Sequence, residues 1–178
     1  MSDILPRRFR LRCEKLAAEQ RFSLGLHAFH PLPADDLAKA MRVCIKTPLE
    51  MALPEEVKSY LSETDTWFGL LLALDPLTIL YNPNQSLARY ESTIMHELAH
   101  VILEHPFSVL SFCDDRYVRS HNARIEKEAA YLGGCLQIPK RALLWATQHD
   151  MDEEVIAEYF GVSLQMVRWR CNATLHKR

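Results

Sequence analysis

Two histidines and a glutamate between His96 and His100 have the types and the spacing of a hydrolytic metal site. Residues four apart on a helix lie one turn apart on the same face, so both imidazoles can bind a single tetrahedral ion. Zinc lowers the pKa of a bound water toward ~7, and in sites with this spacing the intervening glutamate accepts its proton. The segment therefore predicts Zn²⁺ on His96 and His100, with Glu97 as the general base.

The sequence around this segment indicates the helix that the two histidines require. Ile94, Leu98 and Val101 recur at helical spacing and supply an apolar face. Neither glycine nor proline occurs between residues 87 and 104, and Pro106 follows soon after. We therefore expect one uninterrupted helix over residues 87–104.

A zinc ion with an open position for water needs a third protein ligand. Helical spacing over residues 122–136 puts Glu128 inside an apolar stripe and Glu126 outside it. Because an isolated inward-facing carboxylate is costly, a cation must lie beside it, and Glu128 is the predicted third ligand. The alternative is that Glu128 pairs with Arg116 or Arg124. The other downstream acids that qualify by type are Asp114, Asp115 and Glu126.

The segment between the two halves of the site, residues 107–120, lacks a clear period and is predicted to form a loop or short strands. A thiolate is a strong zinc ligand, so Cys113 is predicted as a fourth ligand that excludes water and keeps the protein latent. The alternative is a cysteine packed among neighbouring aromatic residues. The donor that stabilises the tetrahedral oxyanion stays open among Tyr117, His105 and Tyr131.

The remaining pattern predicts an α+β fold that is mostly helical. Apolar runs at 67–74 and 78–81 indicate a hairpin, and hence a small sheet beside the histidine helix. No repeat or Gly/Ser linker divides the chain, so a single domain over residues 1–178 is expected. Its parts would be N-terminal helices at 1–50, a zinc-site core at 65–140 and a C-terminal helix pair at 150–175. Helices are expected over residues 8–24, 34–44, 53–61, 87–104, 122–136, 152–160 and 163–173.

Composition restricts the surroundings in which the chain can work. The 21 basic and 23 acidic residues give a formal net charge of -2, so no global attraction to nucleic acid or to acidic membranes is expected. The sequence has no stretch of about 18 continuous apolar residues and no signal-peptide pattern. The five cysteines are scattered and form no C-x-x-C pair. We therefore expect a cytoplasmic protein that does not enter a membrane.

The block YESTIMHELAHVILEH at residues 90–105, followed by EKEAAYLGGCLQIP at residues 126–139, resembles the ImmA/IrrE family of metallopeptidases. The resemblance extends over about residues 30–170 and includes the hairpin before the motif helix. It implies a gluzincin-like endopeptidase with zinc on two histidines and a downstream glutamate. By position these are His96, His100 and Glu128, with Glu97 as the base.

Two positions depart from the family pattern. Ala130 stands where the family has asparagine, and Gly133-Gly134 replaces an alanine-rich stretch. Glycine weakens a helix by roughly 1 kcal/mol relative to alanine, so the helix after Glu128 is expected to be less rigid.

The resemblance also implies a substrate. Members of this family typically cleave a helix-turn-helix repressor, often encoded nearby, and so switch on stress-response, mobile-element or phage-defence genes. A nucleic acid is a candidate activating signal, although no residue pattern points to one. Two alternatives are a DNA-binding regulator with a structural metal site, and an adaptor that binds the repressor without cutting it.

The end of the chain has the spacing of a helix-turn-helix. Ala157 stands at the packing point, Gly161 in the turn, and Ser163 at the cap of the second helix. Because the related family closes with a similar helix pair inside its peptidase domain, packing within the domain is the favoured interpretation. The side chains that would otherwise face DNA are Gln165, Arg168 and Arg170.

Overall fold

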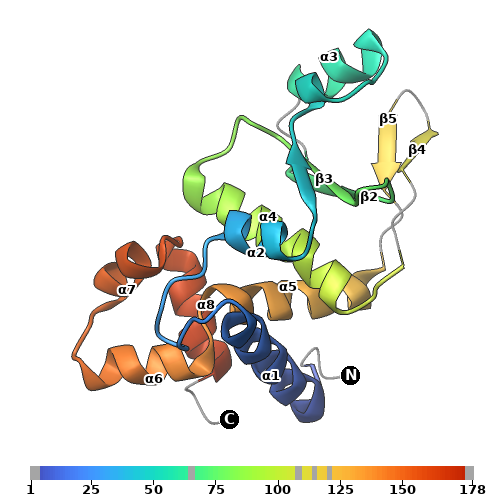
Figure 1. Cartoon of the computed structure of the whole chain (residues 1–178). Helices are drawn as coiled ribbons and strands as arrows, with labels where there is room; N and C mark the ends of the chain where they lie inside the picture. The colour runs from blue at the N-terminus through green and yellow to red at the C-terminus, as the bar shows by residue number, and fades with distance from the viewer. Residues whose placement is uncertain (1–4, 64–66, 107–109, 114–115, 120–121, 175–178) are drawn as a thin grey trace.

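The computed structural model describes residues 5–63, 67–106, 110–113, 116–119 and 122–174. These ranges are mostly helical, with a small mixed sheet and a separate hairpin, which confirms the predicted α+β class (Figure 1). None of the helices in the described ranges combines the length and the apolar character needed to cross a bilayer. The helices are α1 (Arg7–Ser23), α2 (Ala34–Ala40), α3 (Glu55–Glu63), α4 (Leu87–Ile102), α5 (Ala123–Gln137), α6 (Lys140–Gln148), α7 (Glu153–Phe160) and α8 (Leu164–Thr174). The strands are β1 (Cys44–Lys46), β2 (Gly69–Leu72), β3 (Thr78–Tyr81), β4 (Leu110–Cys113) and β5 (Arg116–Arg119), with a 3-10 turn η1 (Pro48–Glu50) before α3.

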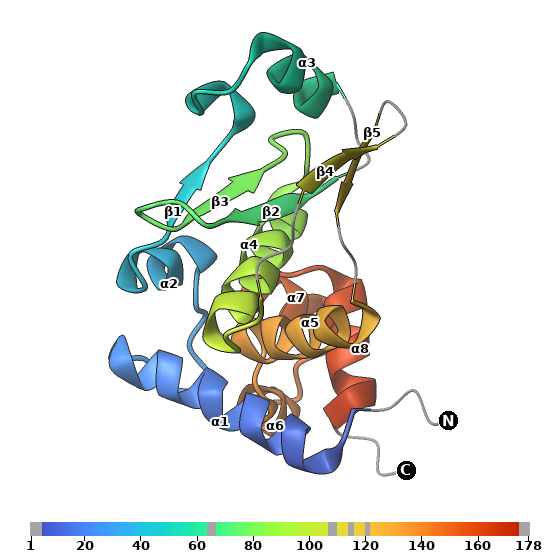
Figure 2. The ribbon, with the colours of Figure 1, turned by 90° about the vertical axis from the view of Figure 1, so that its right-hand side faces the viewer.

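The three-stranded sheet lies against α4, the helix that carries the paired histidines. Strand β3 is central: β1 pairs with it in parallel, and β2 forms the predicted antiparallel hairpin with Leu71 opposite Ile79. In Figure 2 the sheet lies on one side of α4, whereas α5 and α1 lie on the other. Ile79 belongs to the same buried cluster as Ile94 and Leu98 of α4. The motif helix is therefore enclosed between the sheet and α5.

Several elements differ from the sequence prediction. Helix α2 ends at Ala40, because Arg42 adopts a left-handed φ of 57° and Val43 N–H donates to the Ala38 carbonyl at 2.9 Å. The chain then enters β1, a strand that the sequence did not indicate. Helix α6, which begins directly after Pro139, was also missed, although a proline is common at the start of a helix. Strands β4 and β5 pair antiparallel, which agrees with the short strands expected there.

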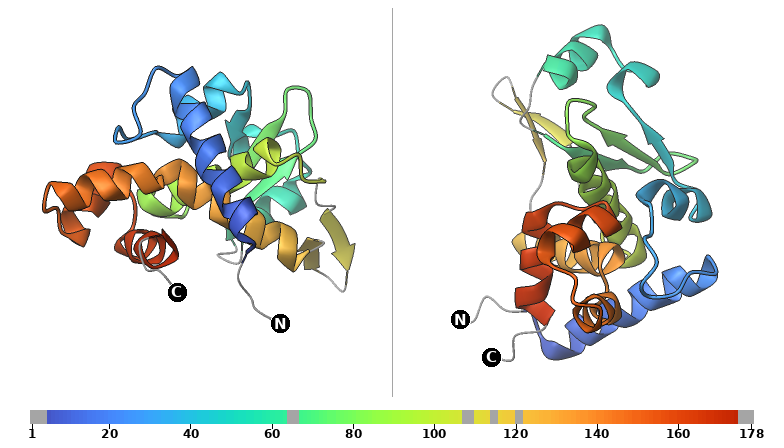
Figure 3. Two further views of the ribbon diagram at one scale, coloured as in Figure 1. Left: turned by 90° about the horizontal axis from the view of Figure 1, so that it is seen from below. Right: turned by 90° about the vertical axis from the view of Figure 1, so that its left-hand side faces the viewer.

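Helices α6, α7 and α8 gather beside α5 and enclose a second buried cluster (orange to red in Figure 3). The helix-turn-helix predicted at the end of the chain is confirmed in geometry. Gly161 adopts a left-handed φ of 65°, and Ser163 Oγ accepts a hydrogen bond from Met166 N–H at 3.1 Å.

Two arginines of α8 have protein partners, Arg170 in the core and Arg168 at the surface. Arg170 is fully buried and donates to the Ile138 carbonyl at 2.9 Å and to Glu14 Oε1 at 2.7 Å. Arg168 Nε donates to Glu153 Oε2 at 2.8 Å. Of the three side chains that a DNA-binding helix would use here, Arg170 is buried in the core. Arg168, which pairs with Glu153, and Gln165 are exposed. The geometry supports packing against the rest of the chain as the role of this helix pair.

Candidate metal centre

Helix α4 presents His96 and His100 on one face. The helix begins at Ser86, whose Oγ accepts from Arg89 N–H at 3.4 Å, and it is anchored by the fully buried Ile94 and Leu98. The Nε2 atoms of the two imidazoles lie 3.1 Å apart. The structure thus brings the two side chains together, as their helical spacing predicts.

The carboxylate beside the imidazoles comes from Glu126, in the first turns of α5. Glu126 Oε2 lies 3.1 Å from His96 Nε2 and 3.6 Å from His100 Nε2. The three ligand atoms all lie within 4.8 Å of one another. A tetrahedral zinc ion with ligand distances of ~2.0–2.1 Å holds its ligand atoms about 3.3 Å apart. Two imidazoles and a carboxylate at these separations fit that ion and leave a fourth position open.

Glu128, the third ligand predicted from the sequence, is not part of this group. Its Oε1 accepts from Arg124 Nε at 2.9 Å, and its Oε2 lies 3.4 Å from His105 Nε2. The pairing with Arg124 is the alternative that the sequence had left open. The geometry favours Glu126 over Glu128 as the candidate carboxylate, and Glu128 as a zinc ligand stays a prediction.

The apolar stripe of α5 shows which side of the helix packs in the hydrophobic core. Which carboxylate lies beside the histidines depends instead on where α5 crosses α4. A Cβ atom at Gly133 would lie 3.3 Å from His96 Cα and 3.3 Å from the Met95 carbonyl oxygen. Glu126 precedes Gly133 by seven residues, which is two helical turns, so both lie on the side of α5 that faces α4. The seven-residue spacing was present in the sequence, but the close approach at Gly133 that makes it informative comes only from the structure.

The two glycines of α5 serve close packing, and the helix runs without a break from Ala123 to Gln137. Gly133 lets α5 approach the backbone of α4, as described above. At Gly134 a Cβ atom would collide with the Trp169 ring of α8. The expectation of a less rigid helix thus omitted the contacts that these positions make.

Gly133→Val is expected to destabilise the protein by about 1–3 kcal/mol and to weaken zinc binding, because the added side chain would press on the α4 backbone at His96. Thermal unfolding and a zinc titration measure both effects. Ala130→Val is the matched control, since Ala130 is exposed on the same helix and should lose only about 0.5–0.7 kcal/mol, the cost of valine in a helix. Equal stability of the two variants would contradict the close approach at Gly133.

Glu97, the predicted base, is buried between α4 and the first residue of β2. Its side chain is only 2% exposed. A Cβ atom at Gly69 would lie 3.4 Å from Glu97 Cγ and 3.6 Å from its Oε1. Gly69 therefore lies directly over the Glu97 side chain.

The remaining residues predicted from the sequence are the oxyanion-donor candidates and the fourth ligand Cys113. Burial, together with the neighbouring His100, lowers the pKa of His105 below its ordinary value, against the opposing effect of Glu128. The Tyr131 ring lies 6.0 Å from the Trp169 ring of α8, so it belongs to the packing of that helix. The side chains of Cys113 and Tyr117 lie outside the described residues.

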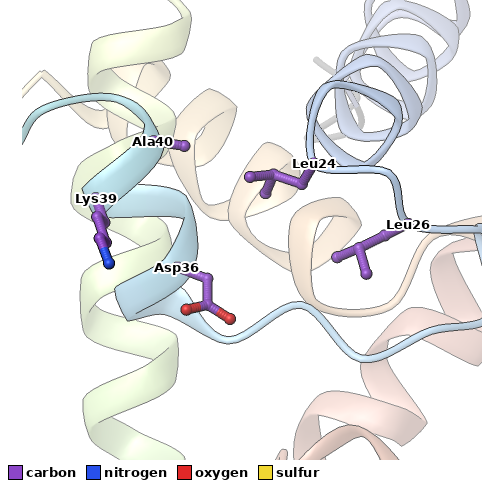
Figure 4. A pocket seen from close by; sticks show the side chains of 5 residues that line it. All are labelled: Leu24, Leu26, Asp36, Lys39 and Ala40. Atoms are coloured by element: carbon purple, nitrogen blue, oxygen red, sulfur yellow. The ribbon is translucent and has the colours of Figure 1, made fainter.

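A surface hollow of about 460 Å³ lies between the end of α1 and α2, where Leu24 and Leu26 face α2 (Figure 4). None of its lining residues belongs to the histidine group, so the hollow is separate from the candidate metal centre. The lining residues are Leu24, Leu26, Asp36, Lys39 and Ala40.

Comparison with known proteins gives a match at the level of a family. The model of the IrrE N-terminal-like domain, peptidase family M78, matches residues 49–172. A solved structure of a Mycobacterium tuberculosis transcriptional regulator is similar, with a TM-score of 0.59 and 20% sequence identity. The alignment covers 97% of this chain and 48% of that regulator, so this chain spans about half of its length and shares its fold. No curated protein matches significantly.

Proposed function

Because this chain belongs to the M78 peptidase family, whose IrrE N-terminal-like domain matches residues 49–172, we propose that it is a zinc-dependent endopeptidase that cleaves a helix-turn-helix repressor. The observation that carries the proposal is the convergence of His96, His100 and Glu126 within 4.8 Å, with Glu97 on the same helix as the histidines. The family match identifies the type of domain but not the residues that would carry out the reaction. The converging side chains would supply the zinc ligands, and Glu97 would supply the base, that peptide hydrolysis needs.

The roles of the residues follow from their positions. His96, His100 and Glu126 would hold the zinc ion, which when bound supplies a Lewis acid for the scissile carbonyl and for the attacking water. Glu97 would accept the proton of that water and return it to the leaving amine. Its burial beneath Gly69 restricts where the carboxylate can lie, one residue after His96 on the same helix.

The choice of substrate is supported by the family and by no side chain described above. The printed name of the similar mycobacterial protein is that of a transcriptional regulator, and the likeness to it concerns the fold. Control of stress-response, mobile-element or phage-defence genes, a nucleic acid signal and a cytoplasmic location stay predictions. Cys113 as a fourth ligand of a latent state also stays a prediction, because its side chain lies outside the described residues.

Removal of zinc tests the proposal. We expect the purified chain to contain about one zinc ion and to cut a repressor encoded nearby at a discrete position, since all three ligands converge on one ion. Chelation with 1,10-phenanthroline should stop the cut, and added zinc should restore it. Elemental analysis gives the zinc content, and intact-mass measurement locates the cut. An unrelated helix-turn-helix protein is the control substrate, and a zinc-loaded chain that leaves every candidate repressor intact would contradict the proposal.

A further inference from the structure

His105 is brought to the metal-binding helix by the way that α4 ends. Glu104 adopts a left-handed φ of 55°, His105 N–H donates to the His100 carbonyl at 3.0 Å, and Glu104 N–H donates to the Val101 carbonyl at 3.1 Å. This pair of bonds is a Schellman motif, formed here without the usual glycine. A non-glycine residue in the left-handed region costs of order 1 kcal/mol, so the surroundings must hold the turn in place. The turn folds His105 back onto His100.

A continuous line of contacts runs from this turn to α5. His105 Nδ1 lies 3.1 Å from His100 Nδ1, on the side of that ring away from the metal site. His105 Nε2 lies 3.4 Å from Glu128 Oε2, and Glu128 Oε1 accepts from Arg124 Nε at 2.9 Å. His100 is almost fully buried, with 5% of its side chain exposed, so its Nδ1 depends on a protein partner.

If His100 Nε2 binds a cation, the ring protons of His100 and His105 can be placed in only one way. A metal-facing Nε2 carries no proton, so His100 must carry its proton on Nδ1 and donate it to His105 Nδ1. His105 then carries its own proton on Nε2, directed at Glu128 Oε2. The opposite polarity would put a proton on His100 Nε2, where it would exclude the metal ion.

We propose that His105 and Glu128 are positioning residues, which fix the proton of His100 on Nδ1 and so hold its Nε2 ready for zinc. The inference rests on the zinc site of the proposed function and goes beyond it. In this inference Glu128 supports a zinc ligand and is not itself a ligand. His105 orients His100 and does not donate to the oxyanion. Partners of this kind behind a ligating histidine typically contribute 10–100-fold to metal affinity.

Two substitutions of His105 separate hydrogen bonding from packing. His105→Leu removes the acceptor for His100 Nδ1–H and is expected to lower zinc affinity 10–100-fold. His105→Asn keeps an oxygen near the position of Nδ1, so it should recover most of that loss. Glu104→Gln is the matched control, because Glu104 is exposed in the same turn, and its zinc affinity should stay within twofold of wild type. Competition with a chelator of known affinity gives the dissociation constants of the full-length proteins.

Long-range ¹H–¹⁵N correlation spectra of the zinc-loaded chain test the proton positions directly. We expect His105 to carry its proton on Nε2 and His100 on Nδ1, and we expect Glu128→Gln to mix the two tautomers of His105, because an amide can donate as well as accept. A purely structural role for these residues would not fix the tautomer.

The outcomes distinguish this inference from the function on which it rests. A wild-type chain that binds no zinc overturns both. A wild-type chain that binds zinc, with His105→Leu within twofold of it, overturns the positioning role alone. A proton on His105 Nδ1 in the zinc-loaded chain has the same consequence, because that nitrogen could not then accept from His100.

Discussion

Glu97→Gln is expected to lower the rate of repressor cleavage by about 10²–10⁴-fold while zinc stays bound. Glutamine has nearly the shape of glutamate, so it should fit the buried space beneath Gly69, but its amide does not take up the proton of the attacking water. The two histidines and Glu126 are untouched by the change. Initial rates of cleavage and the zinc content of the same preparation are the two measurements.

Glu91→Gln is the matched control for this substitution. Glu91 lies on the same helix, and its Oε2 accepts from Ala34 N–H at 2.9 Å, so the residue joins α4 to the start of α2. We expect unchanged cleavage in this variant. The two rival functions make a different prediction for Glu97→Gln: a DNA-binding regulator would still bind duplex DNA, and an adaptor would still bind the repressor. Cleavage by Glu97→Gln at the wild-type rate would therefore remove the peptidase mechanism proposed above.

Glu126→Ala is expected to weaken zinc binding by more than about 100-fold, because losing a ligand should cost more than losing an outer partner. The reason lies in the geometry, since Glu126 Oε2 is the carboxylate oxygen that lies 3.1 Å from His96 Nε2. Glu128→Ala should have a smaller effect, because Glu128 acts through His105. Chelator competition measures both affinities.

The order of these two effects decides between the ligand read from the sequence and the ligand placed by the structure. A larger loss in Glu128→Ala than in Glu126→Ala would restore Glu128 as the third ligand. Circular dichroism and the thermal midpoint of each metal-free variant serve as the folding control. Glu126→Asp adds a further check, because the shorter side chain keeps the charge but should bind zinc more weakly than wild type.

The helices with long apolar periods were predictable from the sequence. Residues 87–104 contain a strong helical period without glycine or proline, and α4 occupies Leu87–Ile102. The hairpin of β2 and β3 was also predicted, because two apolar runs flank a turn. Where helices end was less predictable. The left-handed residues after α2, α4 and α6 are Arg42, Glu104 and Asp150, so no glycine marked these turns.

The sequence by itself determined the parts of the site that lie close together along the chain. Four-residue spacing on a helix places His96 and His100 side by side whatever else the fold does, and Glu97 comes with them. Which carboxylate lies beside the two imidazoles was decided by tertiary structure. Glu126 and Glu128 differ by two residues, which on a helix is a rotation of about 200°, and the crossing of α5 over α4 at Gly133 selects between them. The same crossing, together with the turn at Glu104, turns Glu128 toward His105, a contact between residues that no local period connects.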